Sequence, residues 1–158
     1  MSSKALLIGT SRSGRRALGA AAVAVAVASL VVVLPWEPIR TAWRYHIWAG
    51  LVAVGLGLAA YAGRHRGGLL AGWSATFLAT CWIFVMPPLA ALVRGDTFGD
   101  GGYAVPRPSA VGLSPRAELL TGLRIGPVVA LAVALTAGSA AYGLGAALRR
   151  RSDRSRDA

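Results

Sequence analysis

The feature that most constrains this chain is an uncharged run of 18 residues at positions 17–34. Its centre, AVAVAVA, alternates with the period of two that a β-strand shows, but both faces of such a strand would be apolar. As an α-helix the run is about 27 Å long, close to the roughly 30 Å of a bilayer's hydrocarbon core. A helix also pairs its backbone polar groups internally, as lipid requires. The run therefore predicts a transmembrane helix.

Three further apolar runs follow and decide the fold class. The 158 residues are 55% apolar and only 15% charged, whereas about a quarter of the residues in a soluble domain are charged. We expect an all-α integral membrane protein whose four transmembrane helices form an up-down antiparallel bundle over residues 17–148. The expected spans are residues 17–34, 44–63, 69–93 and 125–148. Residues 1–16 and 149–158 are basic tails, and residues 94–122 form a long outer loop.

Positive charge is unevenly distributed between the segments that connect these spans. Of the 17 Lys and Arg residues, 11 lie in the two tails and the turn at residues 64–66, together with two acidic residues. The other two loops hold six basic and four acidic residues. Because cytoplasmic segments carry the excess of Lys and Arg, both termini are predicted to be cytoplasmic. The net charge of +11 thus indicates orientation in a lipid bilayer rather than a nucleic-acid partner.

The first span has an alternative interpretation as a cleaved signal peptide. Arg15 and Arg16 precede the apolar run, and residues 26–28, AVA, have the small-x-small form of a cleavage site. We favour retention as a span, because the apolar run continues past Ala28 and is longer than a typical signal-peptide core. Cleavage would leave the orientation of the other spans unchanged.

Turn signals mark the connections between the spans. The inner turn AGRHRGG is tight, and Gly63, Gly67 and Gly68 are expected to permit the chain reversal. The outer loop is rich in Gly and Pro and is expected to end in a short helix on the membrane surface, with Ser114 as its N-cap. Pro127 is then a helix-kink candidate that bends the chain into the fourth span.

Few residues in the sequence can carry chemistry. His46 and His65 lie at opposite ends of the second span, about 28 Å apart along a helix, so they cannot share a metal or a haem. Cys81 is the sole cysteine, which excludes a disulfide within the chain. No Asp, Glu, Lys, Arg or His falls in the central part of any span, where such groups mark proton and ion pathways. We therefore predict no catalytic, cofactor-binding or metal-binding residue and no cofactor.

Polar residues in the spans are limited to hydroxyl groups, and we expect these to form hydrogen bonds within or between helices. They are Ser74, Thr76, Thr80, Thr136 and Ser139.

Pro87 and Pro88 are the second set of helix-kink candidates. They remove two backbone donors and free carbonyls one turn earlier, near Ile83 and Phe84. Transporters place such carbonyls at a midplane ion site. Pro87 lies about 27 Å along the third span from Leu69, so we favour a kink or a helix exit near the outer surface.

Small residues spaced by four are candidates for close helix packing, within the bundle or against a partner. The three stripes are Ala49, Ala53 and Gly57; Ala130, Ala134 and Gly138; and Ala137, Ala141 and Gly145. The cluster Arg149, Arg150 and Arg151 is predicted to face anionic lipid.

These observations favour a small multi-pass membrane protein without catalytic activity, acting as an accessory or assembly subunit of a membrane complex. Its expected partners are other membrane subunits or a second copy. The alternative is a pore or facilitator for a small neutral solute, and a third hypothesis is a membrane enzyme or redox subunit with ligands supplied by another chain. The excess of Arg over Lys and the abundance of Ala and Gly suggest a prokaryote, and hence its plasma membrane. We find no family signature in the sequence.

Overall fold

The computed structural model describes residue 7 and residues 12–33, 46–95 and 114–155. Within them the chain is helical between short turns, and no strand occurs. The elements are α2 (Arg12–Val33), α4 (Ile47–Arg64), α5 (Leu69–Arg94), α6 (Pro115–Val133), the π turn η1 (Ala134–Gly138) and α7 (Ser139–Arg154). The last three join into one helix of 40 residues, Pro115–Arg154, which we call the long helix. Four helices are therefore long and apolar enough to cross a membrane, which confirms the predicted all-α membrane fold.

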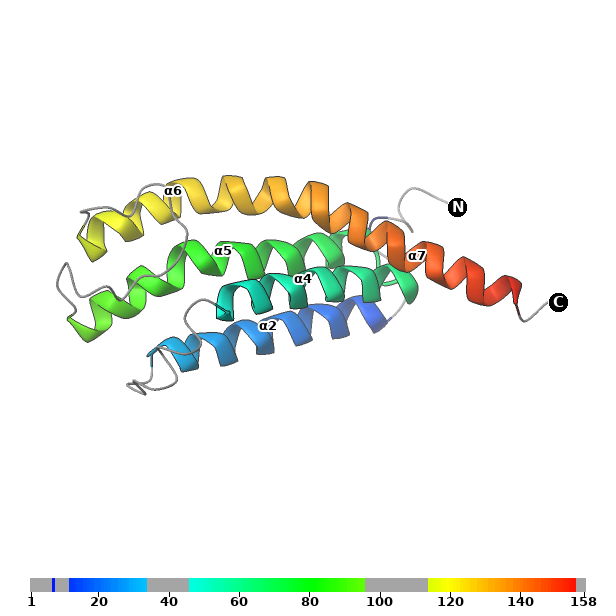
Figure 1. Cartoon of the computed structure of the whole chain (residues 1–158), viewed down its shortest axis with the longest axis horizontal. Coiled ribbons are helices and arrows are strands. Elements are labelled where there is room, and N and C mark those ends of the chain that lie inside the picture. Colours follow the sequence, from blue (N-terminus) through cyan, green and yellow to red (C-terminus); the bar gives the residue numbers. More distant parts are fainter. Residues whose placement is uncertain (1–6, 8–11, 34–45, 96–113, 156–158) are drawn as a thin grey trace.

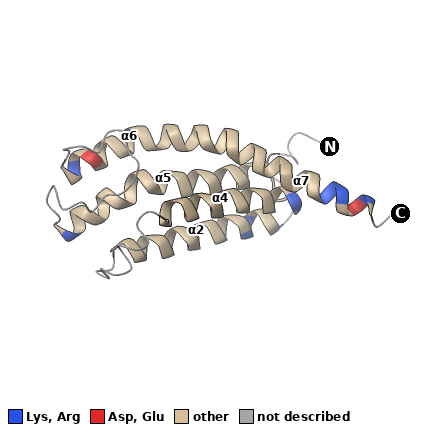
Figure 2. Ribbon diagram, in the orientation of Figure 1, with Lys and Arg blue, Asp and Glu red and all other residues tan. Residues whose placement is uncertain are grey.

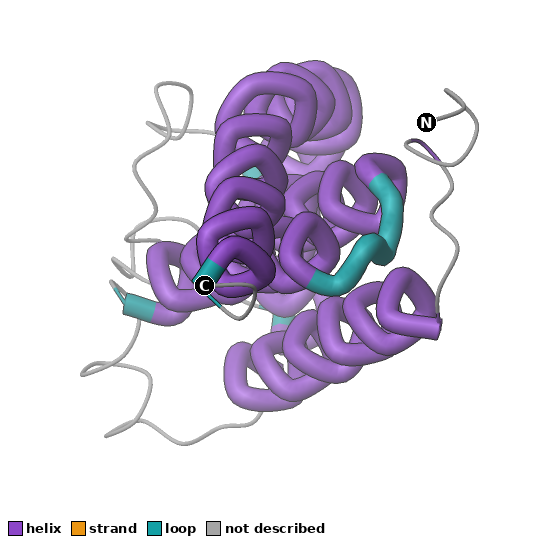
Figure 3. The backbone as a smooth tube through the Cα atoms, turned by 90° about the vertical axis from the view of Figure 1, so that its right-hand side faces the viewer, coloured by secondary structure: helices purple, strands orange, loops and turns teal. Residues whose placement is uncertain are grey.

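The helices alternate in direction along the chain (Figure 1). The α4–α5 pair lies in the middle of the bundle, with α2 on one side and the long helix on the other (Figure 3). α5 packs against α2, α4 and α6, while α4 packs against α2, α5 and α7. The long helix thus rests on α5 in its first half and on α4 in its second half.

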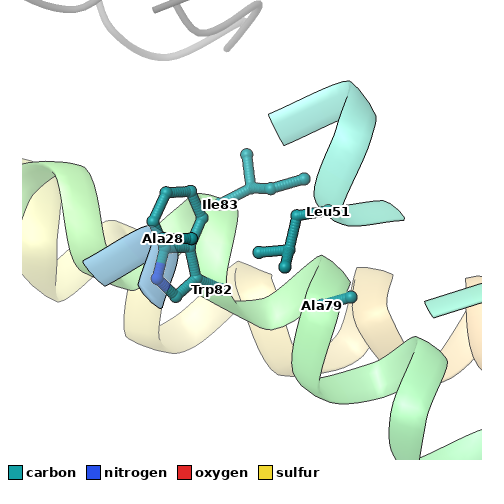
Figure 4. Packing of buried hydrophobic residues seen from close by; sticks show 5 residues of the cluster. All are labelled: Ala28, Leu51, Ala79, Trp82 and Ile83. Atoms are coloured by element: carbon teal, nitrogen blue, oxygen red, sulfur yellow. The ribbon is translucent and has the colours of Figure 1, made fainter. Parts of the chain in front are cut away.

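The core of the bundle is built mainly from alanine. One cluster joins Ala28 of α2 and Leu51 of α4 to Ala79, Trp82 and Ile83 of α5 (Figure 4). A second cluster near the other end joins Ala17, Ala62 and Ala71. Such small side chains let helix backbones approach closely, and in a bilayer, where apolar surfaces have no hydrophobic reason to associate, this close packing holds helices together.

α2 is bound to the bundle at both ends. The Ser13 hydroxyl donates a hydrogen bond to the His65 carbonyl (2.8 Å), and the Arg94 guanidinium donates to the Val32 carbonyl (2.6 Å). α2 starts at Arg12, five residues before the predicted span, and runs through Ala28 without a break. A cationic side chain at a helix C-terminus, as Arg94 is here, offsets the partial negative charge of the unpaired carbonyls.

The closest approaches between helices occur at glycine. A Cβ atom on Gly63 would overlap the Tyr142 carbonyl oxygen of α7, and one on Gly145 would overlap the Ala60 carbonyl oxygen of α4. The two contacts are reciprocal, so neither helix can carry a side chain at this crossing. The packing of the bundle next to the α4–α5 turn therefore depends on a glycine from each helix.

The inner turn differs in detail from the prediction. The residues with positive φ are Arg66 (56°) and Gly68 (88°). Gly63 lies inside α4 and serves the crossing with α7, and Gly67 packs against Gly14 at the start of α2. Two of the three predicted turn glycines thus allow close approach rather than chain reversal.

The prolines do not end their helices. α5 continues past Pro87 and Pro88, both buried, to Arg94, and Gly95 (φ 73°) terminates it. Of the two predicted outcomes at these prolines, the helix exit is therefore wrong, and the kink stays a prediction. The Phe84 carbonyl, which Pro88 deprives of its helical donor, lies against the Cα of Gly122 in α6, close enough that a Cβ there would overlap it.

The predicted start of the last helix is confirmed, but its course differs from the prediction. The Ser114 hydroxyl accepts a hydrogen bond from the Ala117 amide (3.2 Å). α6 then runs through Pro127 into the fourth span instead of lying as a separate surface helix. The reason is the glycine pair Gly122 and Gly126, which packs this segment against Phe84 of α5. The rest of the predicted outer loop, residues 96–113, and the first connection, residues 34–45, lie outside the described residues.

We predict that Gly145→Ala lowers the free energy of unfolding by about 1–3 kcal/mol, because the added methyl group must push α4 and α7 apart. Gly57→Ala is the matched control: a Cβ at Gly57 meets nothing within 4 Å, and alanine is the better helix former. Unfolding in mixed micelles of increasing denaturing-detergent content measures both. Equal stability of the two variants would contradict the packing role of the crossing.

Candidate functional site

The most unusual local structure in the bundle is a π turn where three helices meet. η1 contacts both α4 and α5, and it lies where the long helix passes from α5 to α4. A π turn inserts one residue into an α-helix and is frequent at functional sites. Gly138, at the end of the π turn, packs on α5, and Gly145, seven residues later on the same face of the helix, packs on α4.

Thr76 of α5 occupies the centre of this junction and is fully buried. Its hydroxyl donates to the Gly72 carbonyl (3.0 Å), and the Gly55 carbonyl of α4 lies 3.5 Å away. A Cβ on Gly138 of η1 would come within 3.1 Å of the Thr76 oxygen. Glycine on both neighbouring elements thus makes room for the threonine.

Trp73 links α5 to the start of α7. Its indole nitrogen donates a hydrogen bond to the Ser139 hydroxyl (2.8 Å). A similar bond nearer the other end joins Trp82 of α5 to the Ser29 hydroxyl of α2 (2.8 Å), and Ser29 donates in turn to the Val25 carbonyl (2.7 Å). α5 therefore makes a tryptophan–serine hydrogen bond to each of the helices that flank the central pair.

Thr80 is the exception among these buried polar groups. It is 5% exposed, and its hydroxyl oxygen has no hydrogen-bond partner in the described part of the chain. It lies one turn beyond Thr76, which packs against Gly138 of the long helix. It also lies one turn before Phe84, which packs against Gly126 of the same helix. The register therefore places it opposite the buried Ala130 and Ala134.

Among the described residues, no acidic or basic side chain is bonded to the hydroxyl groups at this junction. His46 and His65 are exposed at opposite ends of α4, and the His65 ring lies against that of Tyr61 (centroids 4.4 Å apart). Cys81 is partly buried in α5. Within the described ranges no group of three or more His, Cys, Asp or Glu residues could hold a metal ion. The arrangement at the junction can form hydrogen bonds and fix helix positions.

Glu118 is a buried carboxylate that sequence reasoning missed. The sequence placed Glu118 among the acidic residues of the outer loop. In the structure it lies in the first turn of α6 and is only 6% exposed. Its spacing of four from Gly122 and of eight from Gly126 could have indicated that it shares their buried face. The start of a helix is favourable for its negative charge.

The predicted small-residue stripes point in different directions. Ala130, Ala134 and Gly138 are buried on α5, while Ala137 and Ala141 are half-buried beside the buried Gly145. Ala49, Ala53 and Gly57 are instead exposed on the outward side of α4. Two stripes therefore contribute to packing within the bundle, and the third lies on its exposed surface.

The predicted lipid-facing cluster separates into two kinds of arginine. The Arg149 guanidinium donates to the Gly63 carbonyl (2.8 Å), which caps the C-terminus of α4. Arg150 and Arg151 are exposed. The close α4–α7 crossing thus brings the Arg149 side chain to the end of α4, and the lipid-facing role of the cluster stays a prediction.

Comparisons with protein-family models, with curated proteins and with solved structures found no match.

Thr76 and Thr80 form a matched pair for testing the junction. Thr76→Val should lower the free energy of unfolding by about 0.6–1.7 kcal/mol, the usual range for a hydrogen bond within a membrane bundle. Thr80→Val should be neutral or stabilising, because it replaces a hydroxyl without a partner by a methyl group of similar size. Unfolding of both variants in mixed micelles provides the comparison. A larger loss for Thr80→Val than for Thr76→Val would contradict the described hydrogen bonding.

Proposed function

We propose that this chain is a multi-pass protein of a prokaryotic plasma membrane, with both termini in the cytoplasm, that acts without catalysis as an accessory or assembly subunit. The observation that carries the proposal is the outward face of α4, which we define as Ala49, Gly50, Ala53 and Gly57. All four residues are exposed, and a Cβ on either glycine would meet nothing within 4 Å. These four residues are small, apolar and exposed, and the larger Val54 and Tyr61, also exposed, lie at helical spacing among them.

The outward faces of α2 and the long helix combine small residues with large ones. α2 presents Val23 and Leu30, each more than 60% exposed, and the long helix presents Val128 and Leu144, each more than 65% exposed. Large branched side chains fill the space against lipid tails. Small residues spaced by four suit the close approach of another helix, whose backbone can then make dispersion contacts along the whole stripe. The spacing of Ala49, Ala53 and Gly57 favours a protein partner at α4.

The charge distribution supports the proposed orientation. Among the described residues, nine arginines and one aspartate lie at the end of the bundle where α7 terminates, and three arginines and one glutamate lie at the other (Figure 2). The end with the larger positive excess is the one expected in the cytoplasm.

Retention of the first span is supported by its contacts. Cleavage after Ala28 would remove the Ser13 bond to the α4–α5 turn and the alanines that pack against α4 and α5. The residues of α4 and α5 that pack against α2 would then be exposed.

Gly57→Leu tests the proposed partner face without disturbing the isolated chain, because the leucine has open space in the bundle. We expect wild-type protein, extracted from its native membrane in mild detergent, to migrate in a complex larger than one chain, and Gly57→Leu to abolish that complex. Gly19→Leu is the matched control: Gly19 is an exposed glycine of α2, and a Cβ there also meets nothing within 4 Å. Wild-type protein that runs as a single chain, or equal loss of the complex in both variants, would refute the proposal.

A further inference from the structure

Exposed arginines from three separate segments gather at one end of the bundle (Figure 2). They come from the first turns of α2, from the end of α4 and from the extension of α7 beyond the other helices (Figure 1). We define this surface, the basic end, by Arg12, Arg15, Arg16, Arg64, Arg150 and Arg151. The one acidic residue among the described residues at this end is Asp153. We propose that the basic end binds the phosphate headgroups of anionic lipids in the adjacent leaflet.

Backbone contacts hold the three segments in fixed relative positions. The Ser13 bond to the His65 carbonyl joins the start of α2 to the α4–α5 turn. The Arg149 bond to the Gly63 carbonyl joins α7 to the end of α4. The arginines therefore extend from an ordered framework rather than from separate tails, so less conformational entropy is lost when a phosphate binds.

The arginines also terminate apolar stripes that are exposed along the sides of the bundle. On α2, Arg16 is followed at helical spacing by Val23, Val27 and Leu30, each more than half exposed. Arg16 and Leu30 are about 21 Å apart along the helix, so a stripe in contact with acyl chains places Arg16 near the headgroups.

The same order occurs on α7 in the opposite chain direction. Leu144 and Leu148, each at least half exposed, lead to Arg151 on the same face. A lipid lying along either stripe would thus meet leucine and valine with its tails and a guanidinium with its phosphate.

This continuity distinguishes a membrane lipid from other phosphate carriers. A guanidinium binds phosphate oxygens with paired hydrogen bonds, whatever molecule carries the phosphate. Only a lipid also provides tails for the apolar stripes that lead to Arg16 and Arg151. The proposal concerns the bundle itself and does not depend on the assembly role of α4.

The test uses full-length protein reconstituted in phosphatidylcholine bilayers with a trace of spin-labelled lipid. Electron paramagnetic resonance measures the association of labelled phosphatidylglycerol relative to labelled phosphatidylcholine. We expect wild-type protein to prefer the anionic lipid, and the double variant Arg16→Gln with Arg151→Gln to lose up to about fivefold of that preference per arginine. The matched control, Arg116→Gln with Arg124→Gln, removes two exposed arginines at the opposite end and should retain the preference.

Three outcomes would overturn the proposal. Wild-type protein could show no preference for the anionic lipid, or both double variants could lose it equally, or inorganic phosphate could abolish it at constant ionic strength. The last result would assign the basic end to a soluble anion. Equal unfolding temperatures for the two double variants verify that a lost preference reflects lost binding and not lost structure.

Discussion

The structure depends on the constraint that lipid places on backbone polar groups. Hydrocarbon offers no water to unpaired amides and carbonyls, so each segment that crosses it must be helical. Nor does it drive apolar helices together, so they must associate through close packing and a few hydrogen bonds. Alanine clusters, the reciprocal contacts of Gly63 and Gly145, and the tryptophan–serine bonds of α5 meet that requirement. Arg94 and Arg149 donate hydrogen bonds to carbonyls at helix ends, which have no donor within their own helix.

The fold class could be predicted from the sequence because it follows from length and charge alone. An uncharged run of 18 residues has few alternatives to a transmembrane helix, and Ser114 followed by Pro115 is a strong local signal for a helix start. The course of the long helix could not be predicted in the same way. Pro127 suggested a bend in the chain. The helix continues past Pro127 because Gly122 and Gly126 pack against Phe84, and this contact joins residues that are far apart in the sequence.

The candidate site was still less predictable. Stripes of small residues recur in any chain rich in alanine and glycine, and their spacing does not indicate which side of a helix faces inward. The stripe ending at Gly138 turned out to be buried, and the one ending at Gly57 exposed. The π turn has no marker in its sequence ALTAG, because it arises where the long helix passes from one neighbour to another. Arg149 could not be separated from Arg150 by composition, since only the helix crossing distinguishes them.

The described contacts separate a well-packed interior from an exposed exterior, on which two surfaces carry our proposals. The junction around Thr76 positions the helices through hydroxyl groups and glycine. The outward face of α4 and the basic end are different in kind: one is small and apolar, the other strongly positive. Both suit binding, the first to a helix and the second to lipid phosphate, and this is why we propose a role in assembly.

The proposed bundle of four retained spans is tested most directly by the accessibility of its two ends in intact cells. In a Cys81→Ala background, single cysteines are introduced by Arg15→Cys, Ser152→Cys and Arg116→Cys, and each variant is treated with a membrane-impermeant maleimide. We predict that the cysteine of Arg116→Cys reacts in intact cells, whereas the other two cysteines react only after the membrane is permeabilised. Labelling of all three in intact cells, or loss of the Arg15→Cys signal from the mature protein, would contradict a bundle of four retained spans.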